Sequence, residues 1–309
     1  MAYETYLTEK AAMRELVNGN GAHLYGKKFF VDTINGSDSN SGKDWFNAKK
    51  TIMAAVNLAR KDSAGDLITA KDVCNYIFIA PGHYNEESLW YAGYNLHLIG
   101  MGCPVPGKDY GVSINYDGSI DSNAAILIQG SGNSLQNLHV YCAEAIPAIL
   151  IDNGDNHFIK NCVVECDGTN ATYGIQANSL KGSRIENCII TNPVTAAIYA
   201  AGGSEHYTIN GHIKDNIMKV GTSAGAKGIL IDNTMTSYNF SIEKNKIDAV
   251  GGGATGIGID NNSSGNIFIV DNYVAVAATA TPIESAGIGV LDNKVTVNGT
   301  PDSSFNDGE

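Results

Sequence analysis

One short hydrophobic pattern recurs along the second half of the chain. Each copy runs apolar, variable, usually an acid or amide, then Asn, Cys or Leu, variable, apolar. The copies are LQNLHV from Leu135, IKNCVV from Ile159, IENCII from Ile185, IKDNIM from Ile213, IEKNKI from Ile242, IVDNYV from Ile269 and VLDNKV from Val290. Their spacing of 21 to 29 residues is too irregular for a strict repeat, so it predicts short strands on a constant frame with loops of varying length.

A second apolar pattern lies between the copies of the first. Its copies are AILI from Ala125, AILI from Ala148, GIQA from Gly174, AIYA from Ala197, GILI from Gly228 and GIGI from Gly256. Clusters of Gly, Asn, Asp and Ser separate the two patterns, as in turns. Parallel copies of one strand cannot pair as hairpins, so they must stack about 4.8 Å apart. The sequence therefore predicts an all-β solenoid, a parallel β-helix of about ten rungs.

The fourth residue of the first pattern is Asn in the last four copies. We expect Asn216, Asn245, Asn272 and Asn293 to form one column, because stacked rungs bring equivalent residues together. Asn at such turns passes amide hydrogen bonds from rung to rung. We interpret this column as a structural ladder and not as a ligand site.

The N-terminal region has a different pattern. Residues 8–17 and 49–61 have helical periodicity, and the second segment places Ile52, Ala55, Val56 and Ala59 on one face. Such a helix covers the open end of a solenoid, which otherwise exposes unpaired backbone.

The pattern divides the chain into three parts. We predict an N-terminal anchor and helical cap over residues 1–74, the β-helix over 75–298, and a polar C-terminal tail over 299–309.

Charge and cysteine content limit the classes of function that the chain can have. The net charge is −12 and the chain has only three arginines, which disfavours nucleic acid because phosphate binding needs a cationic surface. No apolar run is long enough for a membrane span, and the first residues are charged where a signal peptide is apolar. The six cysteines lack zinc-ligand spacing and are expected to be free thiols. We therefore expect no metal, no cofactor, no membrane partner, and synthesis in the cytoplasm.

The segment 29–59 and the sequence PGHY at 81–84 resemble a known module. The residues that carry the resemblance are Val31, Asp32, Gly36, Ser37, Asp38, Gly42, Thr51, Ile52, Ala55, Pro81, Gly82 and Tyr84. They resemble the N-terminal module of right-handed β-helix proteins of the pectin-lyase-like superfamily, and the resemblance covers residues 27–298. It implies a right-handed solenoid. It also implies either a secreted polysaccharide-degrading enzyme or a virion protein such as a bacteriophage tailspike or head fibre.

Two carboxylates are candidates for catalysis. Aligning the second pattern places one residue from each rung in a single column: Gln129, Asp152, Asn178, Ala201, Asp232 and Asp260. Asp232 and Asp260 would then lie on adjacent rungs about 5 Å apart, the spacing that a retaining glycosidase uses for its nucleophile and acid. The alternative is that both residues belong to Asp-Asn turns that end strands.

Aromatic residues gather in the first rungs. Trp90, Tyr91 and Tyr94 are candidates for stacking on sugar rings or for docking a partner protein. The alternative is that they fill a core that widens near the cap.

These observations favour a non-enzymatic structural or attachment protein, a bacteriophage virion component such as a head fibre, decoration protein or small tailspike. Its partners would be other virion proteins, bound through the N-terminal segment, with a host-surface polysaccharide as a further ligand and a homo-trimer as one assembly. The alternatives are an extracellular polysaccharide lyase or glycoside hydrolase acting on the outer face of the rungs, and a carbohydrate-binding module without turnover.

Overall fold

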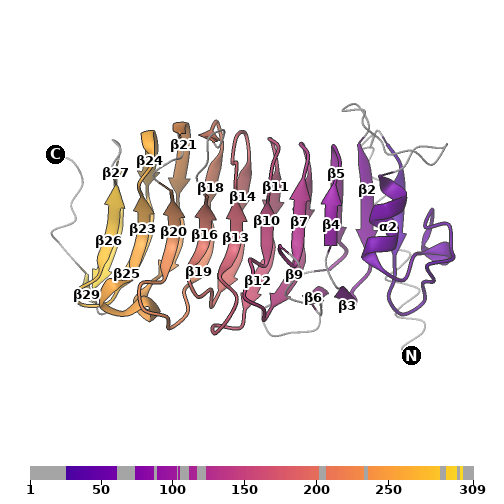
Figure 1. Cartoon of the computed structure of the whole chain (residues 1–309), viewed down its shortest axis with the longest axis horizontal. Helices are drawn as coiled ribbons and strands as arrows, with labels where there is room; N and C mark the ends of the chain where they lie inside the picture. Colours follow the sequence, from indigo (N-terminus) through magenta and orange to yellow (C-terminus); the bar gives the residue numbers. More distant parts are fainter. Residues whose placement is uncertain are drawn as a thin grey trace.

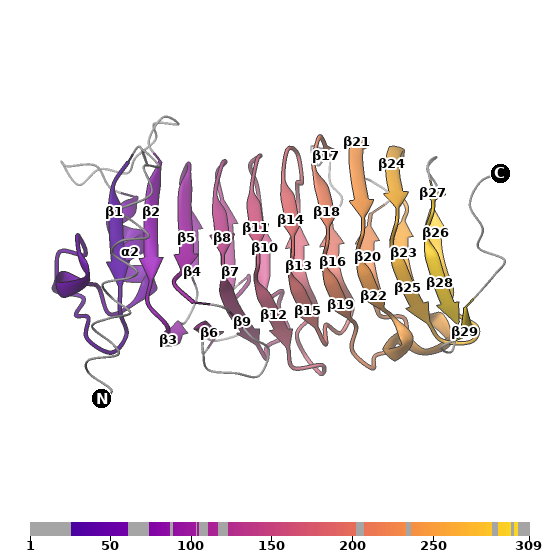
Figure 2. The same ribbon diagram turned by 180° about the vertical axis from the view of Figure 1, so that it is seen from behind.

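The computed structural model describes residues 26–60, 74–86, 89–102, 104, 111–116, 123–201, 207–232, 236–285, 290–297 and 300–301. The chain winds into a parallel β-helix in which three sheets run along one rod (Figures 1 and 2). The predicted all-β solenoid is confirmed. Eight turns of the described chain contribute a strand to every sheet, with partial turns at both ends, slightly fewer than the ten rungs predicted.

Sheet 1 carries the first strand of each turn. Its strands are β1 (Lys28–Val31), β2 (Asn75–Ile79), β5 (Leu96–Gly100), β8 (Ser134–Gln136), β11 (Phe158–Lys160), β14 (Arg184–Glu186), β18 (His212–Lys214), β21 (Thr236–Glu243), β24 (Ser264–Val270) and β27 (Val290–Leu291), and β17 (Tyr207–Ile209) also pairs with β21.

Sheet 2 carries the second strand of each turn. It contains β3 (Gly82–Glu86), β6 (Val112–Tyr116), β9 (Leu138–Cys142), β12 (Val163–Cys166), β15 (Ile189–Thr191), β19 (Ile217–Lys219), β22 (Lys246–Asp248), β25 (Tyr273–Val276), β28 (Lys294–Val297) and β29 (Thr300–Pro301).

Sheet 3 completes the turn. It contains β4 (Leu89–Ala92), β7 (Ile126–Gln129), β10 (Ile149–Ile151), β13 (Tyr173–Ala177), β16 (Ala196–Ala200), β20 (Lys227–Ile231), β23 (Ile257–Asn261) and β26 (Thr281–Ser285). A short 3₁₀ helix, η2 (Val250–Thr255), precedes β23.

The core consists of columns of aliphatic side chains inside the rod. In sheet 1 the column includes Ile159, Ile185, Ile213, Ile242 and Ile269, paired in register and fully buried. Identical side chains at equivalent positions of successive turns pack closely on one another. This explains why the sequence repeats isoleucine itself and not only an apolar residue at this position.

The corner between sheets 1 and 2 has a left-handed backbone at every turn from β8 onward. Its residues have φ between 52° and 56°: Asn137, Asn161, Asn187, Asp215, Lys244, Asp271 and Asp292. Asn and Asp tolerate this conformation better than other residues with a side chain. This accounts for the acid or amide at the third position of the repeated pattern.

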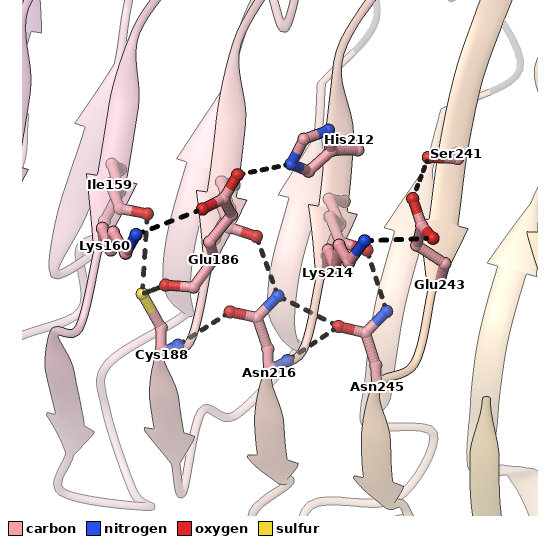
Figure 3. Close-up of polar contacts among 12 residues, drawn as sticks. Ile159, Lys160, Glu186, Cys188, His212, Lys214, Asn216, Ser241, Glu243 and Asn245 are labelled. Atoms are coloured by element: carbon pink, nitrogen blue, oxygen red, sulfur yellow. Dashed lines mark hydrogen bonds and ion pairs between the residues drawn. The ribbon is translucent and has the colours of Figure 1, made fainter. Parts of the chain in front are cut away.

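The next residue at the corner points inward and forms a ladder (Figure 3). Asn216 Nδ2 donates to Asn245 Oδ1 at 3.0 Å, and Asn245 Nδ2 donates to Asn272 Oδ1 at 2.9 Å. Asn272 Nδ2 in turn donates to Asn293 Oδ1 at 2.9 Å. Each amide also donates to a backbone carbonyl, as Asn245 does to Ile213, so these buried polar groups are paired.

Helix α2 (Ile52–Ala59) covers the N-terminal end of the rod (Figure 1). The predicted apolar face is confirmed, because Ile52, Ala55, Val56 and Ala59 are its buried residues. Thr51 caps the helix through its side chain, and a 3₁₀ helix, η1 (Trp45–Asn47), lies just before it. The other predicted helix, 8–17, and the proposed anchor before residue 26 lie outside the described residues.

The opposite end of the rod has its own closing element. The short strand β29 pairs with β28 in the antiparallel sense, whereas every other strand pair is parallel in the part of the chain that the structure describes. β29 therefore lies on the last strand of sheet 2.

Two sequence expectations can be checked on the described residues. Cys74, Cys142, Cys162, Cys166 and Cys188 are free thiols, as predicted, while Cys103 is outside the described residues. No helix in the described part of the chain has the length and apolar character needed to span a membrane.

Candidate functional site

The outer face of sheet 3 presents polar side chains that are joined from rung to rung. Gln129 Nε2 donates to Asp152 Oδ2 at 2.7 Å, and Asn178 Nδ2 donates to Asp152 Oδ1 at 2.9 Å. All three residues directly end or follow a strand of sheet 3, so the turn chemistry that ends the strands also builds this polar row. Ala201 occupies the next position of the row, and because its side chain is a methyl group the row has a gap there.

Two tyrosines and a carboxylate lie beside the polar row. The rings of Tyr173 and Tyr199 stack with centroids 4.6 Å apart and planes at 26°. Tyr199 lies on the strand next to Tyr173, and its hydroxyl donates to Asp232 Oδ2 at 3.1 Å. Burial, followed by the hydrogen bond to Asp232, raises the pKa of Tyr199 to about 12, so its hydroxyl keeps its proton at neutral pH. We call Tyr173, Tyr199 and Asp232 the tyrosine patch.

Asp260 lies on the same sheet but is buried and paired. Its Oδ2 is 2.5 Å from Lys227 Nζ, and its Oδ1 accepts a hydrogen bond from Asn262 Nδ2 at 2.6 Å. The Asp260 side chain is only 5% exposed. Both carboxylate oxygens therefore have partners on the protein.

The predicted column that joined Asp232 to Asp260 was wrong. In the observed register Asp260 lies opposite Leu230, two residues out of step with Asp232. The sequence GIGI from Gly256 can be aligned with GILI from Gly228 in two ways, starting at Gly256 or at Gly258. In the structure it is Gly258 that lies opposite Gly228. A Cβ on Gly228 would lie 2.3 Å from Ile247 Cγ2, and one on Gly258 would lie 2.1 Å from Val274 Cγ1, so the packing inside the corner requires glycine at these two positions. The catalytic role of Asp232 and Asp260 stays a prediction.

The aromatic candidates of the first rungs lie elsewhere on the rod. Trp90 and Tyr91 belong to β4, where their backbones pair with Leu127 and Ile128, and their side chains lie outside the described residues. Tyr94 follows β4 and is half-buried. None of the three is among the residues that form the tyrosine patch.

Sequence reasoning missed Tyr173 and Tyr199. The signal that could have found them is the alternation within the second pattern, where each tyrosine occupies an outward position of its strand next to small residues. Tyr173 pairs with Ala196 across the strands, and this small neighbour leaves room for the ring of Tyr199.

A separate groove lies at the corner between sheets 1 and 2. It has a volume of about 370 Å³, and its lining residues are Gly102, Pro104, Asn137, Asn161, Cys162, Val163, Asn187 and Ile189. None of these side chains is charged. The described residues also contain no group of three His, Cys, Asp or Glu side chains placed to hold a metal ion.

The sequence model of the family described as "Right handed beta helix region" matches residues 124–299, more than half of the chain. The chain belongs to the right-handed β-helix family. The predicted resemblance to right-handed β-helix proteins is thereby confirmed. No curated protein sequence matches this member of the family.

Solved structures extend the family comparison. A pectin methylesterase from Aspergillus niger is 15% identical, with 92% of this chain and 89% of that chain covered and a TM-score of 0.52. The Escherichia coli protein YbhC is 18% identical, with 84% and 75% covered and a TM-score of 0.54. The Dettilon tailspike protein is 12% identical, with 96% and 64% covered and a TM-score of 0.38. At these identities the likeness to the pectin methylesterase and to YbhC establishes that the β-helix fold is shared, and nothing further.

Proposed function

We propose that this β-helix protein is a non-enzymatic attachment protein of a bacteriophage particle, which binds a surface polysaccharide through the tyrosine patch. A head fibre, a decoration protein and a small tailspike are the forms it could take. The observation that carries the proposal is the stacked pair Tyr173 and Tyr199 beside the polar row of sheet 3.

The chemistry of this face suits a neutral or weakly charged glycan. Aromatic side chains offer apolar surface to the C–H faces of sugar rings, while carboxylate and amide groups accept and donate hydrogen bonds to hydroxyls. The polar row continues along the rod from Gln129 past the gap at Ala201 to Asp232. A linear polysaccharide that lies along the rungs would meet one polar contact at most turns.

A rigid rod also suits a role on a particle. Three sheets joined along the whole length resist bending, and the N-terminal segment is the part that we propose binds other virion proteins. The virion location, the homo-trimer and the polysaccharide partner belong to this proposal.

Glycan binding can be tested with the full chain. We expect oligosaccharides from host-surface polysaccharides to bind in calorimetric titration. Tyr199→Ala should weaken the binding by about 10-fold, since stacked aromatics contribute about 0.5–1.5 kcal/mol. Tyr273→Ala is the matched control, because Tyr273 is an exposed tyrosine of sheet 2 and its loss should leave the affinity unchanged. Equal affinity of wild type and Tyr199→Ala would contradict the tyrosine patch as the site.

The alternative function is a polysaccharide lyase or glycoside hydrolase that uses Asp232 and Asp260. What favours it is that Asp232 directly follows β20 and Asp260 lies on the neighbouring strand β23 of sheet 3. Incubating the protein with the same oligosaccharides and assaying for cleavage products distinguishes the two functions. Release of reducing ends or unsaturated sugars that is abolished by Asp232→Asn and Asp260→Asn would replace the attachment proposal with the enzyme, and stoichiometric copies of the chain on a purified virion would support attachment.

A further inference from the structure

A thiol, an imidazole and a hydroxyl lie in line at the N-terminal end of sheet 1. Cys74 comes directly before β2, and its Sγ is 3.0 Å from Nε2 of His97 on β5. The other ring nitrogen of His97, Nδ1, is 2.8 Å from Oγ of Ser134 on β8. Three consecutive rungs thus bring together a nucleophile, a base and a group that orients the base, the arrangement that defines a catalytic triad by geometry.

Reactivity at Cys74 requires one particular tautomer of His97. Burial lowers the pKa of His97, so the imidazole is neutral at pH 7, with one nitrogen as donor and the other as acceptor. In the tautomer that carries the hydrogen on Nδ1, Ser134 Oγ accepts from His97 Nδ1–H and from Gln136 Nε2, the latter at 3.1 Å. His97 Nε2 is then the acceptor that faces the Cys74 thiol.

Tyr76 provides a second polar contact to the sulfur. Its hydroxyl is 3.3 Å from Cys74 Sγ, and its ring stacks on His97 with centroids 4.9 Å apart. Burial and the neighbouring thiol raise the pKa of Tyr76 to about 12, so the phenol remains a donor. A Cys74 thiolate would therefore accept one hydrogen bond from Tyr76 and one from protonated His97, which are the titratable groups in contact with this sulfur among the described residues.

The other described cysteines lack such surroundings. Cys142, Cys162, Cys166 and Cys188 are buried in the core, where a reagent in solution does not reach them. The Cys188 thiol donates to Cys162 and lowers the pKa of Cys162, but both sulfurs of this pair are buried. Burial raises the pKa of Cys142 and Cys166. Cys74 is only half-buried, so a small reagent can reach it.

We propose that Cys74 is a reactive nucleophile, with His97 as its base and Ser134 as the residue that positions the base, and that its substrates are small disulfides. His97 Nε2 takes the thiol proton, and the Cys74 sulfur attacks one sulfur of the disulfide. The S–S bond of the reagent breaks as the mixed disulfide forms. The departing sulfur leaves as a thiolate and receives the proton from His97, so protons and electrons balance.

The test uses the full chain and the neutral disulfide dithiodipyridine, whose released thione is followed by absorbance. We expect one fast thiol, which peptide mapping places at Cys74 and which Cys74→Ser removes. At pH 6.5 its rate constant should exceed that of glutathione by about 10-fold. It should change little up to pH 8.5, because His97 takes the thiol proton within the pair, whereas an ordinary thiol gains about 10-fold per pH unit.

Variants separate the base from the surroundings. His97→Gln should lower the rate constant of Cys74 by about 10-fold and restore the steep dependence of that rate on pH. Ser134→Ala should lower the rate constant by only about 3-fold, because it removes the residue that orients His97 and leaves the base itself in place. His139→Gln is the matched control, since His139 pairs with Glu165 on sheet 2 and should leave the rate unchanged. The wild-type profile decides the matter even if His97→Gln fails to fold. A rate that follows the glutathione profile, or a fast thiol that maps to Cys103, would overturn the proposal.

Discussion

At the scale of single residues, the left-handed corner between sheets 1 and 2 sets the choice of side chain. Six of the seven residues in this corner column from β8 onward are Asn or Asp, and the seventh is Lys244, with φ of 56°. Lysine lacks the short polar side chain that makes the left-handed conformation tolerable. For such a residue this backbone conformation costs about 1–2 kcal/mol of stability. Lys244 is exposed, so its conformation matters more than its packing.

We expect Lys244→Asn to stabilise the protein by about 1 kcal/mol, because it removes this backbone cost and disturbs no buried contact. The reciprocal substitution Asn187→Lys, at an exposed residue with φ of 52°, should destabilise it by a similar amount. Urea unfolding followed by circular dichroism measures both. If the two substitutions shift the midpoint in the same direction, backbone strain is not the cause.

At the scale of elements, the cap helix depends on a buried acid. Glu86, on β3, accepts a hydrogen bond from the backbone N–H of Ile52 at 2.7 Å, at the N-terminus of α2. Burial raises the pKa of Glu86, the hydrogen bonds from Ile52 and Met53 lower it in part, and the nearby Asp38 raises it further. The net shift is upward, so the folded protein binds this proton more tightly than the unfolded chain does.

The sign of the pH dependence follows from this shift. The stabilisation is complete below the ordinary glutamate pKa of about 4.3 and is lost as the pH rises through the raised value. We therefore expect the melting temperature of wild type, relative to Glu86→Gln, to fall between pH 4 and pH 7.

A glutamate with the opposite shift is the control for Glu86. Burial raises the pKa of Glu243, but its bond with Ser241 and the neighbouring Lys214 outweigh burial and lower it. Figure 3 shows Glu243 between these two partners. The melting temperature of wild type relative to Glu243→Gln should therefore rise as the pH increases towards the ordinary glutamate pKa of about 4.3 and change little above it. Parallel trends for the two variants would contradict the assignment.

The elements also show what the sequence alone could and could not predict. The strands and the capping helix follow from apolar spacing, because the period of two and the helical face are local properties. The register of β23 does not follow from the sequence, because Gly256 and Gly258 stand in the same local pattern. They differ in the close contacts that Gly258 makes with the Val274 side chain and the Pro282 carbonyl, which come from another turn. The tyrosine patch depends on that kind of register too, since Tyr173 and Tyr199 are neighbours only across two strands.

At the scale of the whole molecule, each turn contacts chiefly the turns before and after it. Ile185, for example, pairs with Ile159 on one side and Ile213 on the other. Stability in such an array is nearly a sum over turns and their interfaces. Damage to one turn is therefore expected to stay local.

We expect Ile185→Ala to cost about 3 kcal/mol, because it leaves a cavity in a fully buried column. Hydrogen exchange measured by mass spectrometry should become faster in β11, β14 and β18 and remain unchanged in β2 and β24. The control is Ile217→Ala, an isoleucine of sheet 2 that is 48% exposed, which should change exchange little. Uniform acceleration along the rod would mean that the turns unfold as one unit.

The antiparallel strand β29 has a consequence for assembly. A parallel solenoid that ended on a bare strand would offer a template on which another molecule could add its own first strand, and rods would join into filaments. Here the last strand of sheet 2 is occupied, and Pro301 supplies no N–H for a further strand. The last strand of sheet 2 is therefore not open to pairing with the first strand of another copy, which leaves β26 of sheet 3 and β27 of sheet 1 as the last described strands that such a contact could use.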